Sequence, residues 1–157
     1  MYHGQKISCG EDRLIKFWDL RNPKDPVKSI VGHDHWVNTV KYNRFHDQLL
    51  LSGSSDCMVH LWRVSSVSSA PLLEPEDDDI DGLDVEGSGG GESLGGGING
   101  SKAEAADIRV RTFSEHEESV HSLAWSACDA WVLASLSYDG QVVLNHVPST
   151  EKYKILL

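Results

Sequence analysis

Short stretches in which apolar and polar residues alternate recur along this 157-residue chain, each bounded by residues that favour turns. The clearest runs from Leu14 to Trp18, where the period of two predicts a half-buried strand. The fold class that this pattern predicts is all-β. The predicted strands are residues 6–10, 14–20, 27–31, 37–42, 48–54, 58–64, 108–113, 120–125, 132–137 and 141–147. Residues 151–157 are expected to add one final strand.

These strands belong to a sequence repeat. Residues 32–64 form one copy and residues 115–147 a second, while residues 1–21 hold the later part of a further copy. In both complete copies His precedes Asp by 23 residues, and in every copy Ser precedes Asp by four. The recurring residues are Ser8, Asp12 and Trp18; His33, Ser52, Asp56 and Trp62; and His116, Ser135 and Asp139, with Asn145 in place of the last Trp. Matching positions at matching spacings indicate a repeat protein.

Repeats of this kind, with Gly-His near the start and Trp-Asp near the end, resemble the WD40 family of β-propellers. The first copy keeps the literal Phe-Trp-Asp sequence at residues 17–19. The resemblance implies that each blade is a four-stranded antiparallel sheet whose outer strand comes from the start of the next repeat. Propellers close with about 4–8 blades. The chain is therefore expected to be a fragment of about two and a half blades from a seven-bladed ring.

The repeat divides the chain into four parts. Residues 1–31 are the C-terminal part of one blade, 32–64 a WD repeat, 65–107 an acidic insertion, and 108–157 the last repeat with its C-terminal strand. The insertion carries eleven acidic residues, Lys102 as its one basic residue, and nine of the 14 glycines, so it is expected to be disordered. The remainder has 13 acidic and 13 basic residues, so the net charge of −10 belongs to the insertion.

The recurring Ser, His and Asp have two interpretations: a hydrolase triad or a structural network. In WD40 blades the similar set is structural, because the Asp in a tight turn accepts from the His, which meets the Ser, which reaches the Trp indole. Recurrence in two copies favours the network, since a catalytic triad need not be copied into every blade. With Asn145 in place of the Trp, the last network is expected to be shorter.

Other classes of site find little support. Cys9, Cys57 and Cys128 are odd in number and far apart, so neither disulfides nor zinc are expected. The absence of a Lys/Arg cluster argues against nucleic-acid binding. The chain shows no signal peptide and no 18-residue apolar run, which predicts a cytoplasmic protein without direct membrane insertion. We expect neither an enzyme nor a cofactor, because no phosphate loop or nucleophile–base pair lies outside the network.

A closer resemblance lies at the end of the chain. The segments SEHEESV at 114–120, ASLSYDG at 134–140 and KYKILL at 152–157 are similar to the C-terminal part of the EARP- and GARP-interacting protein family. The resemblance implies a scaffold or adaptor that binds the EARP and GARP tethering complexes in endosomal recycling, retrograde transport and vesicle trafficking. It also implies a peripheral location at endosomes and the trans-Golgi network, reached through the tether.

Two further predictions concern protein partners. Trp36 and Tyr138 stand beside the network residues at turn positions that usually point outward, so they are candidate anchors for a partner; packing against the adjacent turn is the alternative. The box formed by Asp12, Trp18, Asp19 and Arg21 resembles the W-D-x-R box through which some propellers dock a cullin-4 ligase adaptor. The alternatives to an adaptor are therefore a ligase substrate receptor or a truncated, non-functional fragment.

Overall fold

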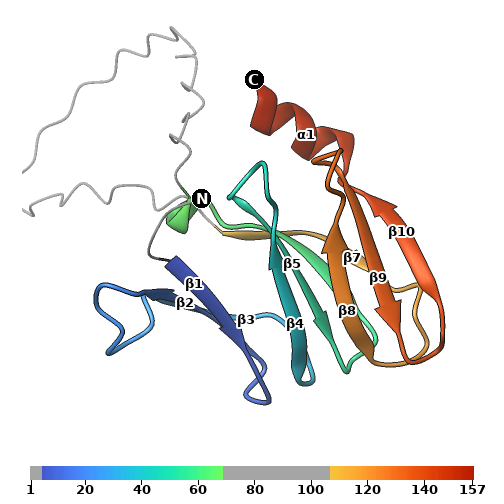
Figure 1. Cartoon of the computed structure of the whole chain (residues 1–157), viewed down its shortest axis with the longest axis horizontal. Helices are drawn as coiled ribbons and strands as arrows, with labels where there is room; N and C mark the ends of the chain where they lie inside the picture. The colour runs from blue at the N-terminus through green and yellow to red at the C-terminus, as the bar shows by residue number, and fades with distance from the viewer. Residues whose placement is uncertain (1–4, 69–106) are drawn as a thin grey trace, which may run out of the picture.

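The computed structural model describes residues 5–68 and 107–157, which form three antiparallel sheets side by side (Figure 1). The first sheet has the order β1-β2-β3, the second β4-β5-β6-β7 and the third β10-β9-β8. The strands are β1 Gln5–Cys9, β2 Leu14–Asp19, β3 Lys28–Val31, β4 Val37–Tyr42, β5 Leu49–Ser54, β6 Val59–Arg63, β7 Ile108–Phe113, β8 Val120–Trp125, β9 Val132–Ser137 and β10 Val142–His146. Each begins and ends within one residue of its predicted bounds, so the all-β prediction is confirmed.

The prediction for the end of the chain was wrong. Residues 151–157 were expected to form a strand, but Ser149–Leu156 forms the helix α1. Apolar Tyr153 and Ile155 alternate with lysines, which imitates a strand, yet Pro148 starts the segment in a conformation suited to a helix N-terminus. Glu151 in the first turn and Lys154 in the last turn match the helix dipole. In the described residues, no helix is both long and apolar enough to cross a membrane.

Two apolar clusters hold the sheets together. One lies between the first and second sheets and includes Ile15, Phe17 and Trp62. The other lies between the second and third sheets and includes Leu61 and Leu123. The second sheet thus turns its Trp62 face toward the first sheet and its other face toward the third.

The outer face of the third sheet is covered by no described residue. Val142 and Leu144 follow their Asp at the same spacing as the fully buried Val59 and Leu61 follow Asp56. Their side chains are nonetheless 65% and 67% exposed. Large apolar side chains with this exposure are uncommon when a neighbouring sheet is present. The three sheets therefore have the arrangement of a partial propeller, as expected.

The two flanks of the insertion are ordered, which corrects the prediction that 65–107 is disordered throughout. Ser65–Val67 forms a short 3₁₀ helix, η1, and residues 69–106 lie outside the described part. The Ser66 backbone and hydroxyl donate to Asp107 at 3.0 and 2.7 Å, and Lys28 forms an ion pair with the buried Asp107 carboxylate. These contacts hold the two ends together, so β7 pairs with β6 despite the long intervening segment.

Antiparallel pairing places the connections at two opposite ends of the sheets (Figure 1). We call the end that carries the recurring Asp turns the network rim; it consists of residues 10–13, 32–36, 55–58, 114–119 and 138–141. The end that carries α1 is the helix rim; it consists of residues 20–27, 43–48, 64–68, 107, 126–131 and 147–157.

The three Asp turns of the network rim share one backbone conformation. The residue after each Asp has positive φ, at 63° for Arg13, 68° for Cys57 and 79° for Gly140. Only the third copy meets this requirement with glycine, the residue that adopts such a φ without strain. Cys57 is therefore a strained turn residue, and like Cys9 and Cys128 it is a free thiol.

Candidate functional site

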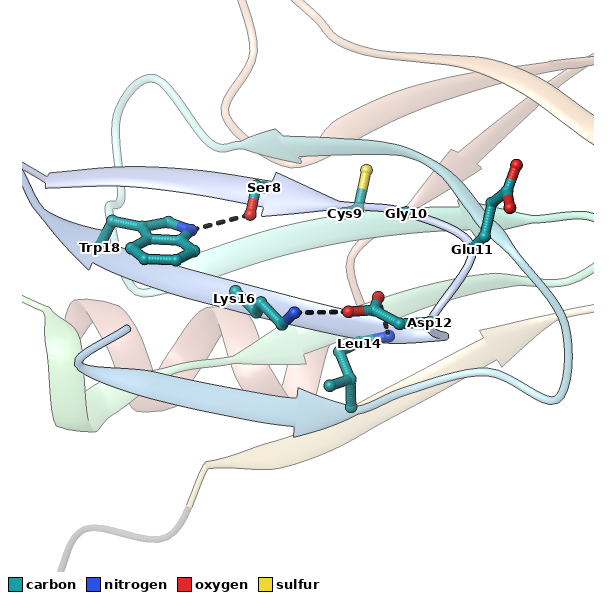
Figure 2. Close-up of a pocket in the computed structure, with 8 residues that line it drawn as sticks. All are labelled: Ser8, Cys9, Gly10, Glu11, Asp12, Leu14, Lys16 and Trp18. Carbon is teal, nitrogen blue, oxygen red and sulfur yellow. Dashed lines mark hydrogen bonds and ion pairs between the residues drawn. The ribbon is translucent and has the colours of Figure 1, made fainter. Parts of the chain in front are cut away.

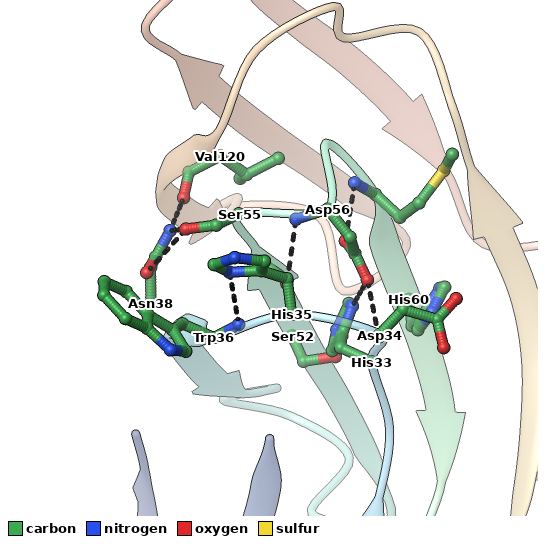
Figure 3. Close-up of polar contacts among 12 residues, drawn as sticks. His33, Asp34, His35, Trp36, Asn38, Ser52, Ser55, Asp56, His60 and Val120 are labelled. Atoms are coloured by element: carbon green, nitrogen blue, oxygen red, sulfur yellow. Dashed lines mark hydrogen bonds and ion pairs between the residues drawn. The ribbon is translucent and has the colours of Figure 1, made fainter. Parts of the chain in front are cut away.

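The second sheet contains a continuous hydrogen-bonded network (Figure 3). His33 Nδ1 lies 2.9 Å from Asp56 Oδ2, and His33 Nε2 lies 2.7 Å from Ser52 Oγ. The Trp62 indole donates to the same hydroxyl at 2.9 Å. Because a carboxylate only accepts, His33 carries its proton on Nδ1 and accepts the Ser52 hydroxyl proton on Nε2. Each buried donor therefore has an acceptor.

Asp56 holds this network to the rim backbone. Its carboxylate also accepts from the backbone amides of Asp34, at 3.1 Å, and Met58, at 3.0 Å. Burial raises the pKa of Asp56, but the bonds from Met58 and His33 outweigh burial and the net pKa is lowered. The charged carboxylate thus fixes the turn around Cys57 and the loop that follows β3.

The third copy has a shorter network. His116 contacts Asp139 at 3.1 Å and Ser135 at 2.8 Å, as His33 does with its partners. Asn145 stands at the Trp position, but its buried Nδ2 has no hydrogen-bond partner. The chain of bonds therefore stops at Ser135, in agreement with the shorter network expected from the sequence.

In the first copy, the Asp of the turn pairs with a lysine of β2 (Figure 2). Lys16 Nζ forms an ion pair with the Asp12 carboxylate, which also accepts from the Leu14 backbone at 3.2 Å. Trp18 still donates to Ser8, at 2.8 Å. Sequence spacing located Ser8, Asp12 and Trp18, but it gave no indication that Lys16 would pair with Asp12.

The network does not have the geometry of a hydrolase triad. Ser52 is fully buried and its hydroxyl is engaged by both His33 and Trp62. A nucleophile must reach the substrate carbonyl and its base must accept the proton at that moment. Through its bonds to His33 and Trp62, the Ser52 hydroxyl instead holds β5 against the network rim.

His60 is a buried residue that the sequence analysis missed. Its ring stacks on His33 with centroids 4.1 Å apart and planes inclined by 9°, and its Nδ1 has no hydrogen-bond partner. Its Nε2 lies 3.4 Å from Arg109 Nη1. The one signal in the sequence was its position two residues before Trp62, which places both side chains on the same face of β6.

The cluster of His33, Asp56 and His60 does not fit a metal ion. These residues offer ligand atoms within 4.8 Å of one another. An imidazole binds a metal in its ring plane, and one ion cannot lie in two nearly parallel planes that are stacked. Both nitrogens of His33 are also bonded already. The stacked pair is therefore a packing feature.

Acid is expected to destabilise the fold between about pH 6.5 and pH 4. Burial lowers the pKa of His60 from 6.5 to about 4, helped by His33 and Arg109, and burial also lowers the pKa of His33. Below pH 6.5 these histidines take up protons in the unfolded chain but not in the folded one. Their contribution to the free energy of unfolding is therefore fully present above pH 6.5 and is lost progressively toward pH 4.

Urea unfolding at neutral and mildly acidic pH measures this decline. His60→Phe keeps an aromatic ring in the stack but cannot titrate, so its midpoint is expected to fall less than that of the wild type. His121→Phe, at an exposed position, is the control and should follow the wild type. A midpoint that does not change with pH in the wild type would contradict the expected proton uptake.

The two candidate anchors, Trp36 and Tyr138, both lie on the network rim and are 48% and 70% exposed. The Trp36 backbone N–H donates to His35 Nδ1 at 2.8 Å, and its carbonyl accepts from the Ser55 backbone at 3.0 Å. The Tyr138 hydroxyl lies 3.2 Å from His121 Nδ1. Both aromatic residues are thus held by local contacts while much of each side chain faces solvent.

Of the ligase-type box, Asp12 lies on the network rim, Trp18 and Asp19 lie in β2, and Arg21 lies on the helix rim. Arg21 is an exposed residue whose guanidinium pairs with the Asp19 carboxylate, with one contact at 2.7 Å. This bidentate pair lowers the pKa of Asp19 to about 2, through the side-chain bond first and the Arg21 backbone bond second. Trp18 is engaged by Ser8. Asp19 and Arg21 therefore pair with each other, whereas Asp12 and Trp18 pair with residues outside the box. Ligase binding remains a prediction of the sequence.

The sequence was also compared with known proteins. The model of the EIPR1 beta-propeller family matches residues 2–62, and that of the WD domain, G-beta repeat, matches residues 108–144. The chain is 47% identical over 150 residues to EARP and GARP complex-interacting protein 1 of Homo sapiens, a match that covers 96% of this chain and 37% of that protein. It is 36% identical over 149 residues to EARP-interacting protein 1 of Caenorhabditis elegans, covering 95% and 37% respectively.

A more distant relative is WD repeat-containing protein DWA2 of Arabidopsis thaliana, 33% identical over 145 residues that cover 90% of this chain and 34% of that protein. The chain therefore spans a little over a third of the length of the curated relatives it matches. The WD40 resemblance predicted from the repeat is confirmed.

Proposed function

Because the chain belongs to the WD40-repeat family, among the relatives of the EARP- and GARP-interacting proteins, we propose that it is a non-catalytic adaptor that binds the EARP and GARP complexes. The observation that supports this most strongly is the 47% sequence identity to EARP and GARP complex-interacting protein 1 along 96% of the chain. The described part presents loops on a scaffold of three sheets, an arrangement that suits the binding of a protein partner better than catalysis.

The network rim is the surface that we propose for this contact. Two large aromatic side chains, Trp36 and Tyr138, are exposed there on loops whose backbone is held by the buried networks. Aromatic residues that are partly held in place before binding lose little entropy on contact, and such residues commonly dominate interface energies. In this proposal the adaptor reaches endosomes and the trans-Golgi network through the tether, and serves endosomal recycling and retrograde vesicle transport.

A binding measurement with purified EARP and GARP complexes tests the proposal. The wild-type chain is expected to bind, and the double variant Trp36→Ala/Tyr138→Ala to bind about tenfold more weakly or worse, because anchor residues commonly contribute more than 1 kcal/mol each. Phe45→Ala is the matched control, since Phe45 is 51% exposed on the helix rim. No binding by the wild type, or an equal loss in the Phe45 variant, would refute the proposed surface.

A further inference from the structure

The five loops of the network rim form one continuous surface. The Val37 backbone donates to the Gly10 carbonyl at 3.1 Å, which joins the first sheet to the second. Asn38 Nδ2 donates to the Val120 carbonyl at 3.0 Å, which joins the second sheet to the third. The Tyr138 backbone donates to Ser119 at 3.2 Å within the third sheet. A partner can therefore contact several of these loops at once.

The two rims differ in charge. The loops of the network rim contain eight acidic residues and one basic residue, a formal charge of −7. The loops of the helix rim contain five of each, a formal charge of zero. The acidic residues of the network rim are Glu11, Asp12, Asp34, Asp56, Glu115, Glu117, Glu118 and Asp139. The acidity of this rim is separate from that of the insertion and belongs to the ordered part of the chain.

Most of this charge is not neutralised within the described residues. Asp12 pairs with Lys16, and Asp56 and Asp139 bond to their histidines. The other five rim carboxylates form no ion pair with a lysine or arginine of residues 5–68 or 107–157. Like charges gathered on one face repel one another and create a negative potential above it. That potential attracts a partner of opposite charge and repels an acidic one.

The exposed aromatic residues share the loops that carry these carboxylates. Trp36 follows Asp34 by two residues in the same loop (Figure 3). Tyr138 precedes Asp139, and its backbone bonds to the loop that holds Glu117 and Glu118. Interfaces place apolar anchors at the centre and charges around them. The aromatic residues are an observation independent of the charge, and they point to a polypeptide partner.

We propose that the network rim binds a basic segment of its protein partner, one in which lysines or arginines flank an apolar or aromatic residue. The apolar residue packs against Trp36 or Tyr138, and the basic residues face Asp34 and the carboxylates of residues 115–118. This inference rests on the proposed function, because the partner is taken to be the EARP or GARP complex. Beyond that function, the inference states which kind of segment is bound, namely a basic one with an apolar or aromatic residue.

Binding kinetics of the 157-residue chain with purified EARP complex test this chemistry. The double variant Glu117→Lys/Glu118→Lys is expected to associate about tenfold more slowly, with a smaller change in dissociation rate. The wild-type association rate should fall as salt is raised, and the variant should show a weaker salt dependence. Asp25→Lys, which reverses one exposed charge on the helix rim, is the control and should match the wild type.

A photo-crosslinking residue in place of the exposed Glu115 identifies the segment directly. A crosslinked peptide of the complex with a positive net charge supports the inference, and a neutral or acidic peptide overturns it. If the wild-type chain does not bind at all, the proposed function fails. If the wild type binds but charge reversal and salt leave its association rate unchanged, only the basic-segment inference fails.

Discussion

Replacement of Trp62 by alanine is expected to lower the free energy of unfolding by about 3–5 kcal/mol. The side chain is only 6% exposed and packs with Ile15 and Phe17 of the first sheet. Its loss leaves a cavity between two sheets and leaves the Ser52 hydroxyl without one of its partners. Domains of this size are stable by only about 5–15 kcal/mol, so the loss is a large fraction of the total.

The matched control is Trp18→Ala. Trp18 donates to Ser8 in the same way, but it is only partly buried and belongs to neither of the apolar clusters between the sheets. Its removal creates no enclosed cavity, so the expected loss is about 1 kcal/mol, the typical net value of one hydrogen bond. Urea unfolding of both variants measures the difference. Equal losses would show that the interface of the first two sheets is not packed as described.

Ser52→Ala is expected to have the other large effect, about 2–6 kcal/mol. One substitution leaves two buried groups without partners, the Nε2 of His33 and the indole N–H of Trp62. Each such group costs roughly 1–3 kcal/mol when it is buried and unsatisfied. The change in volume is small, so the loss reports on hydrogen bonding more than on packing.

Ser135→Ala provides the comparison within the same molecule. Asn145 stands where the third copy would have its Trp, so this substitution leaves only the Nε2 of His116 without a partner. The expected loss is about half of that for Ser52→Ala. The free energies of unfolding are again measured in urea. A loss at Ser135 equal to or greater than that at Ser52 would contradict the difference between the two networks.

The strands and the networks could be predicted from the sequence because both depend on fixed spacing. Alternation with period two located the strands, and the constant separations among Ser, His and Asp located the side chains that meet in space. His33, Ser52 and Asp56 come together because they follow the same offsets as His116, Ser135 and Asp139. Repetition within one chain supplied information that a single copy would not have carried.

What could not be predicted depends on contacts between parts distant in sequence. α1 is held by Glu151, whose buried carboxylate bonds to Arg63 at 3.0 Å, a residue 88 positions earlier. The alternation of apolar residues with lysines in that segment does not by itself distinguish a helix from a strand. His60 is buried by stacking on His33, which lies 27 residues earlier in the chain. The charge of the network rim also emerges only when five separate loops lie on one face.

Hydrogen exchange of the backbone amides, compared between the free chain and the chain bound to purified EARP complex, locates the contact surface directly. Binding through the network rim predicts slower exchange in residues 32–36, 114–119 and 138–141, with residues 43–48 and 126–131 of the helix rim unchanged. Slower exchange confined to the helix rim, with the amides of the network rim exchanging as in the free chain, would contradict binding through the network rim.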